Sequence, residues 1–227
     1  MIGMHKDHVL IIGDTHLPFV HKHYLDFCKE IQARVKCGTV VHIGDLVDNH
    51  AISYHEHHPS GRSPADEMAE ADKLLKGYWF KAFPKLKLCR GNHDRLVDRK
   101  AKTAGLPERA FKPFRQIWDL PAGWEDSTCF IIDDVEYTHG TLTGPNAHIG
   151  HATHNRQSTV IGHTHSTGAI NYLVSNKDRI FGMNVGCGID RNTYAFEYGR
   201  DFCKKPVLGC GVVTDQGKFC QFFPMDL

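Results

Sequence analysis

The first half of the chain repeats one unit, which is a short β-branched apolar run, a polar turn and then an amphipathic helical segment. The apolar runs cover residues 9–12, 39–43 and 86–89, and the segments 22–36 and 64–82 place apolar side chains at helical spacing. This alternation is typical of βαβ units, in which consecutive strands lie parallel in one sheet. The repeat therefore restricts the chain to an α/β fold with a largely parallel sheet.

The second half is richer in strand-like runs, predicted at 128–132, 135–138, 159–161, 167–173, 179–185, 207–214 and 218–223. Three polar turns are predicted to close hairpins: Asp133-Asp134, Asn176-Lys177-Asp178 and Asp215-Gln216-Gly217. Further helices are predicted at 94–102, 107–118 and 145–157. Because no linker separates the halves, we expect two β-sheets within a single domain spanning residues 1–227.

Composition excludes few functions. The 27 basic and 26 acidic side chains give a formal net charge of +1, so no global field favours a polyanion, although a local patch remains open. The first apolar run, Val9 to Ile12, is too short for a signal peptide or a spanning helix, which predicts a cytoplasmic protein without membrane contact. The eight cysteines form no C-x-x-C pair, so we expect reduced thiols.

Ligand-type side chains follow five successive predicted strands. A glycine stands immediately before the ligand group in four of these turns and immediately after it in one. In chain order the turns contain Asp14 and His16; Asp45 and Asp48; Asn92, His93 and Asp94; His139; and His163 and His165. Since open α/β sheets bind ligands outside the carboxyl ends of their strands, these turns are expected to converge.

Converging carboxylates, imidazoles and an amide, without a thiolate, suit divalent ions such as Mn²⁺, Fe²⁺ or Zn²⁺. The set is too large for one ion. Two ions roughly 3.5–4 Å apart would use it, and such a pair stabilises both the attacking and the leaving oxygen of an in-line phosphoryl displacement. The residues thus predict a two-metal centre for phosphoryl chemistry.

Taken singly, each ligand has a structural explanation, because an aspartate after a strand often caps a helix and a lone histidine is often a core residue. Three other groups favour structural or contact roles. The loop 49–63, with His55, His57 and His58, suits substrate contacts better than a third metal; His148, His151 and His154 suit a helix face; and residues 181–190 suit a core strand and a tight turn.

The ordered set D-x-H, G-D-x-x-D, G-N-H-D, H-G and G-H-x-H resembles the calcineurin-like metallophosphoesterase family, and its small stand-alone bacterial and phage members in particular. The five blocks occur in the family's order between residues 13 and 165. The resemblance implies two packed mixed β-sheets flanked by helices, a four-layer sandwich. It also implies hydrolysis of a phosphoester by a hydroxide held between two divalent ions. We expect Mn²⁺, with Fe²⁺, Zn²⁺ or Ni²⁺ as alternatives.

The same resemblance implies a role for each matching residue. One ion is assigned Asp14, His16 and His165, the second Asn92, His139 and His163, and Asp45 bridges them. His93 gives a proton to the leaving oxygen, a task that suits its near-neutral intrinsic pKa. Asp48 orients His93 through a hydrogen bond. Arg95, His50 and His55 are weaker candidates for substrate contacts.

One departure bears on the substrate. The family's protein phosphatases follow the second block with a phosphate-holding arginine, whereas here Asn49 and His50 follow Asp48. This favours a phosphodiesterase acting on nucleotides or nucleic-acid ends over a phosphomonoesterase. The family's DNA-repair nucleases usually carry a capping domain, and 227 residues leave no room for one, which favours a small molecule or an oligonucleotide.

Two hypotheses of other classes remain open. Some members of this fold act as non-catalytic scaffolds after losing ligands, but no ligand and no equivalent of His93 is missing here. A zinc protein whose metals only stabilise the fold would not need His93 and Asp48. A metal-dependent activity would exclude this zinc protein. The sequence leaves the oligomeric state open.

Overall fold

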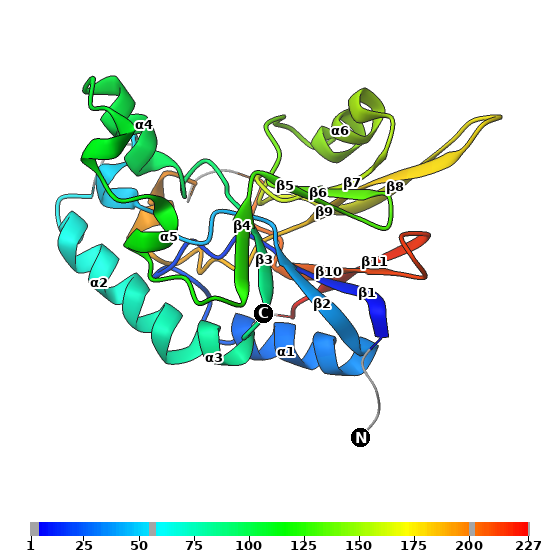
Figure 1. The fold of residues 1–227 in the computed structure, drawn as a ribbon, viewed down its shortest axis with the longest axis horizontal. Helices are drawn as coiled ribbons and strands as arrows, with labels where there is room; N and C mark the ends of the chain where they lie inside the picture. Colours follow the sequence, from blue (N-terminus) through cyan, green and yellow to red (C-terminus); the bar gives the residue numbers. More distant parts are fainter. Residues whose placement is uncertain (1–4, 55–57, 200–202, 227) are drawn as a thin grey trace.

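Two β-sheets pack face to face in the computed structural model, which describes residues 5–54, 58–199 and 203–226. Helices cover both outer faces, so that the order of layers is helix, sheet, sheet, helix (Figure 1). The predicted α/β architecture of two mixed sheets flanked by helices is confirmed.

The first sheet has the strand order β11-β10-β1-β2-β3-β4. Strands β1 to β4 are mutually parallel, as the βαβ pattern predicts, whereas β10 pairs antiparallel with both β1 and β11. The bounds are β1 His5–Ile12, β2 Cys37–His42, β3 Leu86–Cys89, β4 Trp124–Ser127, β10 Gly209–Thr214 and β11 Phe219–Pro224. Strand β4, which is short and contains two acidic residues, was not predicted from the sequence.

The second sheet has the strand order β5-β6-β7-β9-β8. Its three central strands are parallel, and an antiparallel strand closes each edge. The bounds are β5 Cys129–Ile132, β6 Val135–Thr138, β7 Ser158–Ile161, β8 Gly168–Val174 and β9 Arg179–Val185. The three predicted hairpin turns join β5 to β6, β8 to β9 and β10 to β11.

The alternation of side chains along β1 explains the layers. Leu10 and Ile12 belong to the core between the first sheet and its helices, whereas Val9 and Ile11 belong to the core between the sheets. A strand that is buried on both faces needs this continuous apolar run. The covering helices are α1 Tyr24–Val35, α2 Pro64–Leu74 and α3 Phe80–Ala82 on the first sheet, and α6 Ala147–Asn155 on the second.

Two predicted helices differ from the structure. The segment 64–82 is helical throughout but contains a π-helical turn, Leu75–Trp79, between α2 and α3. The prediction of one helix over 107–118 is wrong. This segment forms a 3₁₀ turn, Glu108–Ala110, and a one-turn helix, α5 Phe114–Ile117. The physical reason is Pro113, which lacks an N–H group and forces the residue before it out of the helical region.

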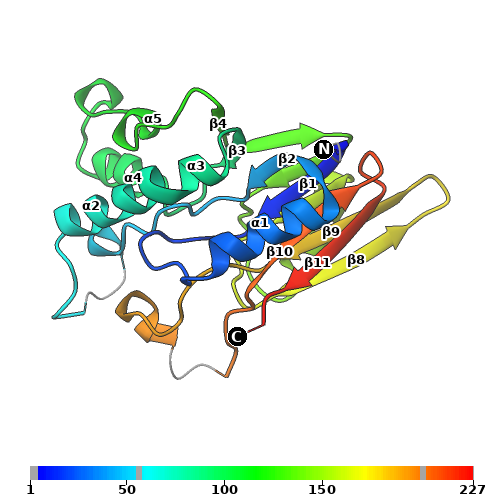
Figure 2. The same cartoon turned by 90° about the horizontal axis from the view of Figure 1, so that it is seen from below.

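The remaining helical elements lie at the carboxyl ends of the parallel strands. They are α4 Leu96–Thr103 and two 3₁₀ turns, η1 His50–Ile52 and η4 Tyr194–Gly199. The hairpin turns and the beginning of β1 lie at the opposite end, because β10 runs antiparallel to β1 and β9 runs parallel to β7 (Figures 1 and 2). Within the described ranges, no helix has the length and apolar composition that a membrane crossing requires.

Candidate metal centre

The five predicted turns converge at the carboxyl ends of β1, β2, β3, β6 and β7. Backbone hydrogen bonds tie the first two turns together, because the N–H groups of Thr15 and His16 donate to the Asp45 carbonyl at 3.1 and 2.9 Å. His16, Asp45 and His163 all have positive φ angles, of 47°, 47° and 65°. Non-glycine residues rarely adopt this conformation, and it turns the chain sharply where each ligand-type side chain follows a strand.

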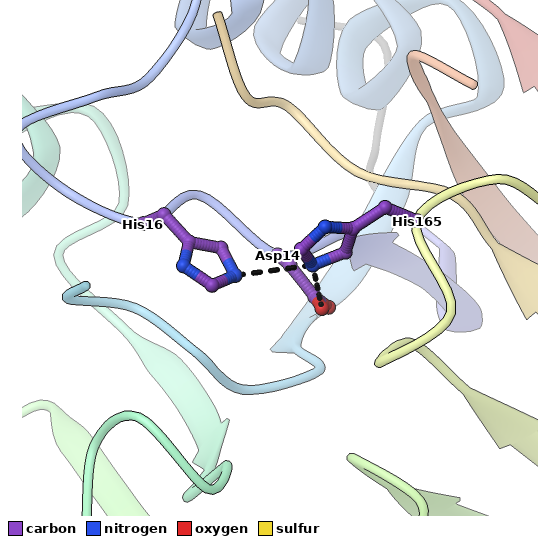
Figure 3. Close-up of side chains that lie close together, drawn as sticks. All are labelled: Asp14, His16 and His165. Atoms are coloured by element: carbon purple, nitrogen blue, oxygen red, sulfur yellow. Dashed lines mark hydrogen bonds and ion pairs between the residues drawn. The ribbon is translucent and has the colours of Figure 1, made fainter. Parts of the chain in front are cut away.

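Asp14, His16 and His165 form one group of potential metal ligands, and one donor atom of each lies within 4.8 Å of the others. His165 Nε2 lies 3.1 Å from Asp14 Oδ2 and 3.1 Å from His16 Nε2 (Figure 3). His16 Nδ1 donates to Asp48 Oδ1 at 2.6 Å, which leaves Nε2 directed toward His165. The hydrogen bond on one ring nitrogen thus fixes which nitrogen faces the group.

Asp45, His139 and His163 form a second group. His139 Nδ1 lies 3.2 Å from the Ile43 carbonyl, so this nitrogen carries the proton and Nε2 faces the group. There Nε2 lies 2.9 Å from Asn92 Oδ1 and 3.1 Å from Asp45 Oδ2. The amide oxygen of Asn92 therefore joins the second group.

Asp45 connects the two groups. Its Oδ2 lies 3.1 Å from Nε2 of His139 in the second group and 3.6 Å from Nε2 of His16 in the first. Its Oδ1 accepts a hydrogen bond from the His93 backbone N–H at 2.8 Å. One carboxylate thus faces both groups while its other oxygen is fixed by the third turn.

The donor chemistry of the two groups fits divalent cations. Asp14 Oδ1 is fully buried and receives no hydrogen bond from any described residue. Two imidazole nitrogens facing each other at 3.1 Å, beside that carboxylate, need a cation or a proton between them. The buried thiol of Cys187 nearby donates to backbone carbonyls, and its pKa is raised because burial disfavours the thiolate. The available donors are oxygens and imidazole nitrogens, which suit Mn²⁺, Fe²⁺ or Zn²⁺.

His93 lies beside the two groups and is held by Asp48, and one donor atom from each of His16, Asp45 and His93 also lies within 4.8 Å of the others. Its Nδ1 lies 2.6 Å from the Asp48 carbonyl oxygen and 3.1 Å from Asp48 Oδ1. Nε2 is therefore the nitrogen left for a substrate, and no described residue hydrogen bonds to it. Asp48 Oδ1 also accepts from His16, so this single carboxylate orients one imidazole of the first group and the imidazole outside it.

Opposing effects set the charges in this buried site. Burial alone would lower the pKa of His93, but the negative charges of Asp45 and Asp48 and the hydrogen bonds to Asp48 raise it to about 10. Burial likewise opposes protonation of His139, and the charges of Asp45 and Asp14 raise its pKa to about 9. For Asp45, burial favours the neutral acid, yet the surrounding imidazoles hold its pKa well below the usual range. Bound cations would act against protonation of these imidazoles.

Two positions in the motifs require glycine because the carboxylate of another turn lies against them. A Cβ atom on Gly91 would lie 2.1 Å from Asp45 Oδ1, and one on Gly162 would lie 2.2 Å from Asp14 Oδ1. Any other residue would displace the carboxylate. The glycines that begin the third and fifth blocks therefore provide space for the ligands of other turns.

The weaker candidates lie at the margin of the centre or outside the described residues. Arg95 Nε donates to the Gly91 carbonyl at 3.1 Å, so its guanidinium stands at the base of α4 near Asn92. His50 is buried, and its ring centroid lies 5.6 Å from that of Tyr194 and 6.4 Å from that of Phe19. His55 belongs to the segment 55–57, which lies outside the described residues. Neither Arg95 nor His50 is a member of the two ligand groups.

Several residues that support the turns had no predicted role. Asp94 accepts hydrogen bonds from the N–H groups of Gly91 and Val47, at 2.8 and 3.2 Å, and so fastens the third turn to the second. His42 is buried within 3.0 Å of Thr15 Oγ1, and burial lowers its pKa to about 3, so it is neutral. Asn184 of β9 donates to the Gly162 carbonyl at 3.1 Å. Only the position of Asp94, inside a motif, was a usable signal.

His148 and His151 of α6 have structural partners, in agreement with the helix-face interpretation. His148 Nε2 lies 2.8 Å from Asn171 Oδ1 of β8. His151 Nε2 accepts from the N–H groups of Thr141 and Leu142, at 3.0 and 3.3 Å, and so holds the chain that follows His139. Helix α6 therefore stabilises the fourth turn through hydrogen bonds to the residues that follow it.

The comparison with family models settles the class of protein. The model of the calcineurin-like phosphoesterases matches residues 8–180, a range that includes all five blocks. The chain belongs to the calcineurin-like phosphoesterase family, whose members generally act on phosphoester substrates with divalent metals. No curated protein matches the chain.

Several solved structures are similar along most of their length. A metallophosphoesterase from Sphaerobacter thermophilus is 16% identical at a TM-score of 0.49, with 98% of this chain and 89% of that chain covered. A novel archaeal phosphodiesterase is 17% identical at 0.46, with 96% and 99% covered. Vacuolar protein sorting 29 from Cryptosporidium parvum is 16% identical at 0.48, with 97% and 91% covered. These low identities say nothing about what this chain binds.

Proposed function

We propose that this chain is a two-metal phosphodiesterase that acts in the cytoplasm on nucleotides or nucleic-acid ends, and that residues 1–227 form one catalytic domain. The observation that carries the proposal is the position of Asp45, whose Oδ2 faces both ligand groups while its Oδ1 fixes the backbone of His93. A centre that only stabilised the fold would not need a separate imidazole held beside it.

The proposed metal ligands follow the two groups. Asp14, His16 and His165 would hold one ion, Asn92, His139 and His163 the other, and Asp45 both. We expect Mn²⁺, with Fe²⁺, Zn²⁺ or Ni²⁺ as alternatives. When bound, the two ions would supply a water molecule of lowered pKa and would neutralise the charge that develops on the phosphoryl oxygens.

The residues around the ions have two tasks in this proposal. His93 presents Nε2 to the leaving oxygen and gives it a proton, while Nδ1 stays hydrogen bonded to Asp48. Asp48 keeps both His93 and His16 in one orientation, and its negative charge and hydrogen bond favour the protonated form of His93. Proton donation matters most for leaving groups that are poor without it.

Preference for a diester follows from the residue after Asp48. Asn49 occupies the position at which the family's protein phosphatases carry a phosphate-holding arginine, and its side-chain N–H donates to the His93 carbonyl at 3.0 Å. Asn49 therefore supports the proposed acid and adds no positive charge for the doubly charged group of a monoester. A phosphodiester, with a single negative charge, suits this centre better.

The test is hydrolysis of bis-p-nitrophenyl phosphate and of p-nitrophenyl phosphate by metal-stripped protein refilled with Mn²⁺. We expect faster diester turnover, its loss on stripping and its loss in Asp45→Asn. Monoester preference would contradict the diesterase assignment, and silence on both substrates with Mn²⁺ bound would favour the non-catalytic scaffold.

A further inference from the structure

A large cleft opens next to the candidate metal centre, between α4 and the irregular segment that precedes α5. Its volume is about 1330 Å³, and its wall includes Asn92, the amide that joins the second ligand group. The far wall contains residues 105–109 and Phe111, and from Pro107 onward it belongs to the segment that does not form the predicted helix. The cleft thus begins at the metal centre and extends away from it past α4.

The cleft is strongly basic although the whole chain is almost neutral. Two acidic side chains line it, against five basic ones: Arg90, Arg95, Arg99, Lys102 and Arg109. The formal net charge of +1 for the entire chain does not predict such a local concentration of basic side chains. A wall of this kind attracts a polyanion locally even though no global field does.

Most of these cations are not neutralised by carboxylates. Arg95 donates from Nε to a backbone carbonyl, and Arg99 lies over the Tyr54 ring, 5.2 Å from its centroid, which leaves the charge intact. Neither Lys102 nor Arg109 has an ion pair with any residue of the described ranges. Arg90 is the exception, because its Nε lies 3.6 Å from Asp126. Several positive charges are therefore available for phosphates.

Apolar side chains stand among the basic ones. Phe111 and Leu106 line the cleft, Leu106 is 52% exposed, and Pro107 and Pro113 stiffen the wall that carries them. A positively charged groove interleaved with an aromatic side chain is the arrangement that binds single-stranded nucleic acid without sequence preference. The volume also exceeds the roughly 300–1,000 Å³ of ordinary small-molecule pockets.

We propose that this cleft binds a single strand of nucleic acid and leads one of its phosphodiesters to the metal centre. The inference rests on the proposed function for the cutting step and deepens it, since it selects an oligonucleotide over a free nucleotide. Lys102 and Arg109 contact phosphates, and Phe111 stacks on a base. Asn92, shared by cleft and centre, marks where the strand meets the reacting phosphate.

Binding is tested apart from cleavage, with metal-free protein in EDTA. The probe is a fluorescein-labelled oligodeoxythymidylate about ten nucleotides long, within the ~4–16 nucleotide span of common single-strand sites. Anisotropy gives its Kd as a function of salt. We expect Lys102→Glu/Arg109→Glu to weaken binding by about tenfold or more and to reduce the slope of log K against log salt by about 1.4, at roughly 0.7 for each lost phosphate contact.

The control variant is Lys81→Glu/Lys177→Glu, which changes the net charge equally at exposed positions outside the cleft. It should bind like the wild type. Phe111→Ala should weaken binding about tenfold with an unchanged salt slope, because stacking is not ionic. Equal weakening by both charge variants, or tighter binding of a duplex of the same length, would overturn the assignment.

The two proposals fail in different ways. If the wild type does not turn over bis-p-nitrophenyl phosphate with Mn²⁺ but the cleft variants still lose the oligonucleotide, the cutting step is wrong and the binding site stands. If turnover is present and the cleft variants bind the oligonucleotide like the wild type, the centre stands and the cleft assignment is wrong.

Discussion

The two ends of the sheets carry the same residue type in the same backbone conformation, for different purposes. At the hairpin end, Asp133, Asp134 and Asp215 have φ angles of 50°, 58° and 51° and are exposed. At the other end, Asp45 has a φ of 47° and is 1% exposed. A left-handed aspartate is therefore only a mark of a tight turn. Burial among imidazoles from other turns is what distinguishes the candidate site.

The electrostatic environments of the two ends differ in the same way. Asp215 lies 4.0 Å from Lys218 in an exposed pair, which contributes about 0–1 kcal/mol to stability. Asp14 and Asp45 are buried with three imidazoles within 4 Å, an arrangement whose desolvation cost must be offset by cations or protons. The stability of the ligand end thus depends on the cations or protons that it binds, whereas the stability of the hairpin end does not.

The largest effect is expected from exchanging one aspartate at each end for asparagine. Asp14→Asn should lower the affinity for Mn²⁺ and reduce turnover of bis-p-nitrophenyl phosphate by about a thousandfold, since a catalytic ion supplies several kcal/mol. Asp215→Asn should leave both unchanged. Calorimetric titration with Mn²⁺ and initial rates measure the two effects. Equal losses in both variants would show that the distinction between the ends is wrong.

The next effect concerns His93, the imidazole proposed as the proton donor. His93→Ala should retain both ions but lose turnover on substrates with poor leaving groups by about a hundredfold or more, the scale of general acid catalysis. The loss should shrink for p-nitrophenolate, which leaves without a proton.

Rates for a series of aryl diesters measure this dependence, with the exposed His154→Ala of α6 as the matched control. Intact turnover of poor leaving groups in His93→Ala would end the assignment of His93 as the acid.

The convergence of the five turns was predictable because strand ends and glycines are local features of the sequence. Parallel strands bring their carboxyl ends to one edge, and the structure places Asp14 and Asp45 there with the histidines that follow β6 and β7. The hydrogen bonds that support the turns were harder to predict from the sequence. Asn184 of β9 donates to the Gly162 carbonyl at the end of the neighbouring strand β7, and no spacing rule links residues so far apart in the sequence.

The basic cleft was not predictable for a different reason. Its wall at 107–118 was expected to be a helix, and a helix would have placed Phe111 and Arg109 on separate faces. Two prolines open the segment instead, so that residues 105–109 and Phe111 line one side of the cleft. The net charge did not indicate the basic cleft, because +1 is the sum over the entire chain and hides local clusters.

A smaller effect is expected in the pH dependence of stability without metal. The raised pKa of His93 means that its contribution is fully present below about 6.5 and is lost as the pH rises toward 10. Asp45 and Asp48 together hold the proton, and Asp48→Asn keeps only the charge of Asp45. The wild type should therefore lose about 1–3 kcal/mol more of its free energy of unfolding between pH 6.5 and 10 than Asp48→Asn.

Urea denaturation in EDTA at the two pH values measures this difference, with Asp215→Asn as the hairpin-end control. Parallel pH profiles for the wild type and Asp48→Asn would mean that Asp48 does not stabilise the protonated form of His93.

The smallest effect separates glycines that make room for ligands from one that does not. A methyl group on Gly91 would overlap Asp45 Oδ1 and its backbone nitrogen, at 2.1 and 2.5 Å, whereas nothing lies within 4 Å of one on Gly77. Gly91→Ala should therefore destabilise the protein by about 1–3 kcal/mol and weaken Mn²⁺ binding. Gly77→Ala, in the helical segment between α2 and α3, should stabilise it by up to about 1 kcal/mol. Thermal unfolding with and without Mn²⁺ compares them. If Gly91→Ala kept both its stability and its response to Mn²⁺, the close approach of the second and third turns would not matter to the centre.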